Sequence, residues 1–175
     1  MFRPPLTLFC AGVLSFGAGL ALADPAPPTA GPGIVIADFG IYCRQDRTQL
    51  EPAPGTSAGH VRLLESSPDF VFRQQTIPAR LGISFGVASV ADRDIPDARI
   101  EVWLPGAPSP EMWYSNMYAG DSETRGFTFD HSHELVTGPW RMEAWDGETL
   151  LYRIEFEILP GTELPGLSSD CDFVS

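Results

Sequence analysis

Apolar and polar side chains alternate along much of this chain, and this two-residue period limits its possible folds more than any other feature. A strand buried on one face has this period, whereas an amphipathic helix repeats every 3.6 residues or so. The alternation recurs in Val35 to Cys43, Phe70 to Phe72, Leu81 to Val87, Ile100 to Leu104, Phe127 to Phe129, Trp140 to Ala144 and Leu150 to Ile158. Within the first of these segments, Val35, Ala37, Phe39, Ile41 and Cys43 are expected to share one face. The pattern predicts an all-β chain.

Clusters of turn-forming residues separate the alternating segments. They are "APGTSAG", "ADRDIPD", "PGAPSP", "AGDSET", "TGP" and "DG", and each supplies the Gly, Pro, Asp or Ser that a tight connection needs. Asp146-Gly147 is the clearest hairpin signal, because Asp-Gly suits a type I′ turn. We find no internal repeat. The spacing predicts an immunoglobulin-like antiparallel β-sandwich of about seven to nine strands.

The two ends of the chain differ in composition from the segment between them. Residues 1–23 are typical of a secretory signal, with Arg3 at the start, an apolar stretch from Leu6 to Leu22 and an A-x-A cleavage site that ends at Ala23. Residues 24–33 are rich in Pro and Gly and are expected to form a flexible leader outside any sheet. The sandwich domain is then expected at 34–160, followed by a tail over 161–175. The expected location is the periplasm or the exterior of a bacterial cell.

The cysteines fit an oxidising compartment. Cys10 would leave with the signal, so the mature chain would hold Cys43 and Cys171. An even number of cysteines in an exported protein predicts one structural disulfide. A redox-active pair would more often have the close C-x-x-C spacing.

Length and charge exclude several classes of function. Residues 24–175 suffice for one domain with a hydrophobic core. Removal of Arg3 with the signal would change the formal net charge from −12 to −13. This charge disfavours binding to nucleic acid or to an anionic membrane surface. After signal cleavage, no remaining segment has the apolar length that a membrane span needs.

Several short blocks resemble a known family. The blocks "GIYC", "APGT", "RLGISFGV", "ELVTGPW" and "LLYRIEFEI" occur in an order similar to that of an uncharacterised family of exported bacterial proteins, domain of unknown function 3859. The resemblance extends over about Ile34 to Cys171. It implies an exported domain and brings no assigned activity.

One motif is typical of hydrolases but lies in the wrong context. Gly82 to Gly86 match G-x-S-x-G, and Asp130 and His133 follow in the order of an α/β-hydrolase triad. That motif requires a strand followed at once by a helix, whereas Ser84 lies within an alternating segment. We therefore predict that the chain is not an enzyme and has no catalytic residues.

The segment "DHSHELVTGPW" contains two histidines one residue apart. In an extended segment His131 and His133 would point the same way, and Glu134 could add an oxygen ligand for zinc or copper. The competing interpretation is a polar corner at the end of a strand, because short metal motifs often occur by chance. The second interpretation is preferred, and no cofactor is predicted.

Aromatic residues offer a different kind of site. Trp140 alternates with Met142 and Ala144 and is expected in the core. Trp103 and Trp145 fall on the opposite face of their strands, among Arg99, Glu101, Arg141 and Glu143, and Trp113 and Tyr114 lie in or near a Pro-rich loop. The four aromatic residues Trp103, Trp113, Tyr114 and Trp145 could bind another exported protein or a glycan. The prediction is a non-enzymatic binding or interaction module, and the alternative is a metal-binding protein that uses His131 and His133.

Overall fold

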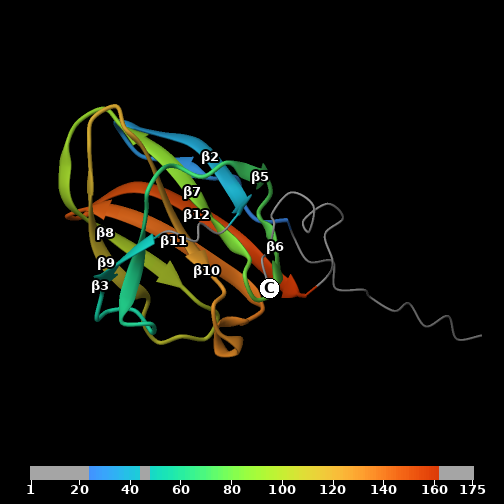
Figure 1. The fold of residues 1–175 in the computed structure, drawn as a ribbon. Coiled ribbons are helices and arrows are strands. Elements are labelled where there is room, and N and C mark those ends of the chain that lie inside the picture. The colour runs from blue at the N-terminus through green and yellow to red at the C-terminus, as the bar shows by residue number, and fades with distance from the viewer. Residues whose placement is uncertain (1–23, 44–47, 162–175) are drawn as a thin grey trace, which may run out of the picture.

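Two packed β-sheets form the body of the molecule (Figure 1). The structure is a computed structural model that describes residues 24–43 and 48–161. The large sheet has six strands in the order β1-β12-β11-β8-β9, with β6 also paired to β12, and the small sheet has four in the order β10-β7-β2-β5. The strands of the large sheet are β1 (Thr29–Ala30), β6 (Thr76–Ala79), β8 (Ile95–Trp103), β9 (Glu111–Met117), β11 (Gly138–Asp146) and β12 (Thr149–Pro160). Those of the small sheet are β2 (Ile34–Tyr42), β5 (Phe70–Phe72), β7 (Ser84–Ala91) and β10 (Ser122–Thr128).

The order of the strands is that of an immunoglobulin sandwich. Strands β2, β7 and β10 are neighbours in one sheet, as strands A, B and E are in that fold, and β12, β11, β8 and β9 correspond to G, F, C and C′. The predicted all-β, immunoglobulin-like antiparallel sandwich is therefore confirmed. The only helical element among the described residues is one turn of 3₁₀ helix, η1 (Ser132–Glu134). Within the same residues, no helix is long and apolar enough to cross a membrane.

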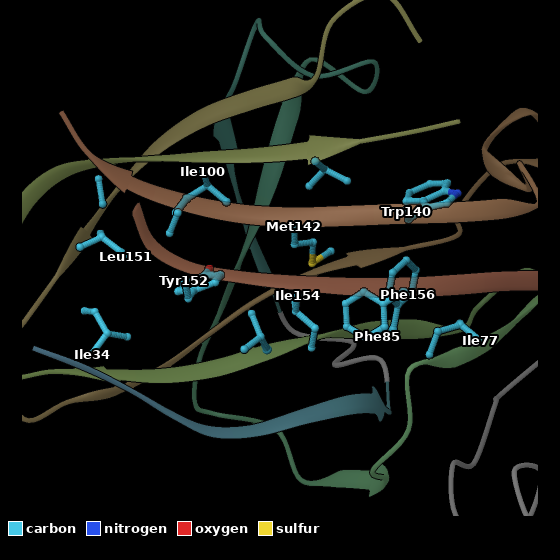
Figure 2. Packing of buried hydrophobic residues seen from close by; sticks show 14 of the residues in the cluster. Ile34, Ile77, Phe85, Ile100, Trp140, Met142, Leu151, Tyr152, Ile154 and Phe156 are labelled. Carbon is cyan, nitrogen blue, oxygen red and sulfur yellow. The ribbon is translucent and has the colours of Figure 1, made fainter. Parts of the chain in front are cut away.

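The inward faces of the two sheets form one hydrophobic core. Trp140 is 1% exposed, as predicted, and its ring meets those of Phe85, Phe127 and Phe129 at centroid distances of 5.1 to 5.8 Å. Figure 2 shows Trp140 beside Phe85 and Phe156 at one end of this core and Leu151 near Ile34 at the other. Edge-to-face packing of this kind stabilises a core beyond simple burial.

A β-bulge changes which residues of β2 face the core. The register with β7 shifts between Ile36 and Asp38. Val35 is consequently 62% exposed and Ala37 is also exposed, whereas Ile34 and Ile41 are buried. The prediction of one continuous face from Val35 to Cys43 was wrong, because an extra residue in one strand inverts the alternation on either side of it.

The Pro/Gly-rich leader enters the large sheet instead of remaining outside it. Thr29 and Ala30 pair with Arg153 and Tyr152 of β12, and Gly31 N donates to Leu151 O over 2.7 Å. A side chain at Gly31 would collide with the Leu150 carbonyl. Proline-rich composition thus did not prevent pairing at an edge, where a strand needs partners on one side alone.

Several other elements differ from the sequence prediction. The described residues hold twelve strands, more than expected, because five were not predicted: the separate hairpin of β3 (Thr48–Pro52) and β4 (His60–Leu64), the short strands β1 and β6, and the edge strand β9. Leu81 precedes its strand and is 51% exposed. Residues 113 and 114 lie in β9 and not in a loop.

The hairpin between β11 and β12 is present, but its turn differs from the prediction. Asp146 pairs with Thr149, so Gly147 and Glu148 form the turn. Gly147 has φ +57°, and Glu148 is not among the residues with positive φ. A type I′ turn needs positive φ at both positions, whereas type II′ needs it at the first alone, where glycine is favoured. The turn therefore fits type II′.

Candidate functional site

A pentapeptide pattern, R-x-E-x-W, occurs twice in the large sheet. It appears as RIEVW over residues 99–103 in β8 and as RMEAW over residues 141–145 in β11. The two strands are antiparallel neighbours, and Glu101 pairs with Glu143. The sequence analysis found no repeat, because the similarity is too short to stand out before the strands are aligned.

The pairing places the ends of the two motifs opposite each other. Arg141 pairs with Trp103, and Arg99 pairs with Trp145. The Arg141 guanidinium carbon lies 5.1 Å from the Trp103 ring centroid, and that of Arg99 lies 5.7 Å from the Trp145 ring centroid. Both distances are within the range of cation–π attraction. The two motifs therefore make the same cross-strand contact in opposite directions.

Each motif also makes the same contacts within its own strand. The Trp103 indole N–H donates to Glu101 Oε2 over 3.1 Å, and the Trp145 indole N–H donates to Glu143 Oε2 over 3.3 Å. Arg99 Nε donates to Glu101 Oε1 over 2.7 Å. Each glutamate thus orients the tryptophan two residues later, and both indoles are fixed on the outward side of the sheet.

Neighbouring strands extend this surface. Tyr114 of β9 pairs with Arg99 and is 58% exposed, and Met112 pairs with Glu101. On the other side, Arg153 Nε of β12 donates to Glu143 Oε1 over 2.6 Å. We call this surface the twin-motif face, and its members are Arg99, Glu101, Trp103, Met112, Tyr114, Arg141, Glu143, Trp145 and Arg153.

The charges of the twin-motif face are paired with one another. Glu143 is 2% exposed although it points away from the core, because arginine and tryptophan side chains cover it. Arg141 Nε lies 3.0 Å from Glu143 Oε1, as an ion pair whose angle is poor for a hydrogen bond. Buried carboxylates persist where cations and donors surround them. The network thus pairs the charges of this face and leaves Trp103 and Trp145 partly exposed on it.

Trp113 does not belong to this face. It pairs with Ile100, so its side chain points to the inner side of the large sheet and packs partly against the core. The structure therefore brings together Trp103, Tyr114 and Trp145 of the four predicted aromatic residues, and it places Trp113 elsewhere.

The two histidines of "DHSHELVTGPW" lie side by side at the surface. The rings of His131 and His133 are stacked, with centroids 5.4 Å apart and planes 10° apart, and both residues are exposed. Glu134 is buried, and its Oε2 accepts the backbone N–H groups of Asp130 and His131, each over 2.7 Å. This is the role of an acidic residue in a capping box. Glu134 therefore stabilises η1, and its Oε2 is already engaged by two backbone N–H groups instead of being offered to a metal ion.

The described part of the chain contains no group of three or more His, Cys, Asp or Glu side chains suited to a metal ion. The stacked histidines would supply two ligands, and zinc sites in proteins have three or four. The copper or zinc site thus stays a prediction.

Ser84 lacks the setting of a nucleophile. It is fully buried at the first position of β7, and its hydroxyl shares a hydrogen bond of 2.9 Å with that of Thr128. Asp130 forms an ion pair with Arg62, at 2.7 Å between Nη2 and Oδ2. β7 is followed by another strand, β8, and not by a helix. The G-x-S-x-G match therefore belongs to a strand and the turn before it, and it does not form a nucleophile elbow.

The predicted disulfide involves one cysteine that lies outside the described residues. Cys43 is half-buried directly after β2, whereas Cys10 and Cys171 lie outside the described residues. The cleavage site after Ala23 lies outside them as well.

Comparison with known proteins identifies the family. The family model of DUF3859, a domain of unknown function, matches residues 32–158. The chain belongs to this family. No curated protein matches this DUF3859 chain. A solved structure of an immunoglobulin-like protein from Pseudomonas aeruginosa is similar to it with a TM-score of 0.44 and 16% identity, over 77% of this chain and 98% of that one.

The sequence analysis of this DUF3859 chain did not predict a cleft that contains a buried arginine. Arg125 is 6% exposed, and it lines a cleft together with Trp113 and Tyr118. A lone arginine in the strand "SETRGFT" gives no signal of burial, since its partners come from β9 and from its own strand. The roof of that cleft, the β3–β4 hairpin, was not predicted either.

Proposed function

We propose that this chain is a non-enzymatic, exported binding module whose twin-motif face binds another protein. The observation that supports the proposal is the pair of R-x-E-x-W motifs, which hold two half-buried tryptophans in fixed orientations on the outer side of a sheet. Tryptophan, tyrosine and arginine dominate the binding energy of protein interfaces. Side chains that are already ordered lose less entropy on binding.

The composition of the face favours a protein over other partners. Tryptophan, tyrosine, methionine and arginine are enriched in interfaces, whereas unpaired charges are depleted from their centres. Here Glu101 and Glu143 are both engaged by arginines, so a partner would not have to compensate an isolated charge. A sheet face offers a broad surface, which matches the shape of a folded partner better than that of a small molecule.

The proposed location is the periplasm or the cell exterior. The secretory features of residues 1–23 and the pair Cys43 and Cys171 support this location. The partner would then be a second exported protein.

Site-specific photo-crosslinking tests the proposal. A photo-reactive amino acid at position 114, on the twin-motif face, is expected to trap one partner in cells. The same group at position 35, which is 62% exposed on β2 of the small sheet, is the matched control and should not trap it. The double variant Trp103→Ala/Trp145→Ala should abolish the crosslink at position 114 and leave the fold intact by circular dichroism.

Two results would contradict the proposal. One is the same crosslinked protein from positions 35 and 114, which would indicate random proximity. The other is an undiminished crosslink in the double tryptophan variant.

A further inference from the structure

A cleft lies on the open side of the sandwich, and Tyr114 is the one residue of the twin-motif face that also lines it. Its lining comes from β9 at the edge of the large sheet, from β10 at the edge of the small sheet, and from the β3–β4 hairpin and the residues that follow it. Its volume is about 450 Å³. Small-molecule sites in proteins have volumes of roughly 300–1,000 Å³. The cleft is thus large enough for a small ligand.

Three contacts hold the hairpin over the cleft. Met112 N of β9 donates to Gly55 O over 2.9 Å, in the loop between β3 and β4. Arg62 Nη2 of β4 donates to Asp130 Oδ2 over 2.7 Å, and the Ser67 hydroxyl donates to Ser122 O over 2.7 Å. These contacts reach both edge strands, so the cleft is formed before any ligand arrives.

The lining combines aromatic rings with hydroxyl groups and balanced charge. Four aromatic residues contribute, among them Trp113 and Tyr118, and seven serine and threonine residues surround them. Two arginines, Arg62 and Arg125, are balanced by two glutamates, Glu51 and Glu123. A cleft without net charge in a chain of formal net charge −12 does not attract an anion. This charge balance favours a neutral, polar ligand.

Arg125 supplies an independent indication that a ligand binds here. Its side chain is 5% exposed, and Nη2 donates to Glu123 Oε2 over 2.5 Å and to Asn116 O over 2.8 Å. Its Nε and Nη1 have no hydrogen-bond partner among the described residues, and neither has the hydroxyl of Thr124, which also lines the cleft. Buried polar groups are almost always hydrogen-bonded, and exceptions mark sites where a further group belongs.

We propose that this cleft binds a neutral carbohydrate. A sugar ring has a face of C–H groups that packs on aromatic rings such as those of Trp113 and Tyr118. Its hydroxyl groups both donate and accept hydrogen bonds, so one sugar can pair with donors such as Arg125 and acceptors such as Glu123. A ligand with a carboxylate or phosphate would instead face the two glutamates of the lining.

Saturation-transfer NMR and titration calorimetry with defined sugars test this proposal on the purified protein. The probes are neutral mono-, di- and trisaccharides of glucose, galactose, mannose and N-acetylglucosamine, with glucuronic acid and sialyllactose as acidic counterparts. At least one neutral probe should bind. Tyr118→Ala, which removes a half-exposed ring, should weaken that binding at least about fivefold. Trp103→Ala on the twin-motif face is the matched control and should not change the affinity.

A second variant tests the hydrogen-bonding part of the site. Arg125→Lys keeps the charge and removes the planar set of donors, so it should also weaken sugar binding. If Arg125→Lys does not fold, Tyr118→Ala together with Thr124→Val keeps the proposal testable. The proposal is overturned if no neutral saccharide binds at millimolar concentration, if acidic probes alone bind, or if Tyr118→Ala binds as the unchanged protein does. Tyr114 borders both sites, so the variants separate the two proposals: the crosslink at position 114 should depend on Trp103 and Trp145, which do not line the cleft, and sugar binding should not.

Discussion

Tryptophan occupies two different environments in this chain. Trp140 is 1% exposed, and its indole N–H donates to Val136 O over 2.7 Å. Trp103 is half-buried on the outer side of the large sheet, and the Arg141 guanidinium lies over its ring. The same residue type therefore stabilises the core in one place and forms a contact surface in the other.

The same substitution should have different effects at these two positions. Trp140→Ala is expected to lower the free energy of unfolding by about 3–5 kcal/mol, because it leaves a cavity among Phe85, Phe127 and Phe129. Trp103→Ala should cost about 1 kcal/mol, the size of a partly exposed cation–π contact. Urea unfolding followed by circular dichroism measures both. Equal losses at the two positions would show that Trp103 has a structural role.

Tyr152 makes the free energy of unfolding depend on pH in the alkaline range. Burial of its side chain raises the pKa of Tyr152 to about 12, with a smaller opposing effect from the Arg125 charge. In the unfolded chain a tyrosine loses its proton near pH 10 or so. The stabilising contribution of Tyr152 is therefore complete below about pH 10 and is lost as the pH rises towards about 12.

Tyr152→Phe should remove this part of the alkaline loss. At neutral pH the variant should be as stable as the unchanged protein or slightly more stable, because the Tyr152 hydroxyl has no hydrogen-bond partner among the described residues. Burial also raises the pKa of Tyr42, so some alkaline sensitivity should persist in the variant. Urea unfolding at about pH 8 and about pH 11 compares the two proteins. Parallel pH profiles would rule out this role for Tyr152.

At the scale of elements, two short strands protect the outer edge of β12. β1 pairs with its first half at Tyr152 and Arg153, and β6 runs parallel to its last residues, Glu157 to Pro160. An uncovered edge strand offers free backbone groups to other chains and promotes aggregation. β1 and β6 therefore contribute solubility as well as stability.

Removal of β1 should make the protein prone to association. A chain that starts at Ile34 loses the pairs at Thr29 and Ala30, and we expect a loss of about 1–3 kcal/mol in unfolding free energy. Light scattering should rise with protein concentration. A chain that starts at Ala26 keeps β1 and serves as the control. If both truncated chains behave alike, the pairing of β1 is not important in solution.

The β3–β4 hairpin should open more easily once one of its contacts is lost. In Arg62→Ala the ion pair with Asp130 disappears, so backbone amides of β3 and β4 should exchange with deuterium faster. Amides of β11 and β12, in the core of the large sheet, should keep their protection. Mass spectrometry of the exchanged peptides distinguishes this local opening from general destabilisation, which would speed up exchange in all strands.

The sequence predicted the strands whose two faces differ most. β8, β11 and β12 alternate clearly, because one side of each enters the core and the other meets charged neighbours. β9 was missed since it lies at an edge with both faces partly exposed, and β6 was missed because it contains Pro78. Whether such a segment forms a strand depends on which neighbouring strand the rest of the fold places beside it, and the intrinsic strand propensity of the segment does not decide it.

The candidate site was predictable in part for the same reason. Alternation placed Trp103 and Trp145 opposite the core side of their strands, and the structure agrees. What the alternation could not provide is the register, which brings Arg99 opposite Trp145. Register depends on bulges and turns such as the one at Gly147, and these follow from backbone geometry in three dimensions.

At the scale of the whole molecule, the predicted disulfide would join the end of β2 to a residue beyond β12. In the chain-entropy model, closure of so long a loop stabilises the fold by about 4–5 kcal/mol. A reducing agent should therefore lower the melting temperature of the oxidised protein markedly. Cys43→Ser with Cys171→Ser should melt at the lower temperature with or without reductant. Two free thiols in the protein purified without reductant would disprove the bond.

The pairing of β1 with β12 also has a consequence for biosynthesis. β1 precedes and β12 follows every other described strand, so their pairing must wait until the ribosome has completed β12. β1 and β6 pair with β12 alone among the described strands of the large sheet, whereas β11 lies between β12 and β8. The large sheet therefore cannot be completed before β12 has been made. Until then the partly made sandwich exposes apolar strand faces, the kind of surface that chaperones bind.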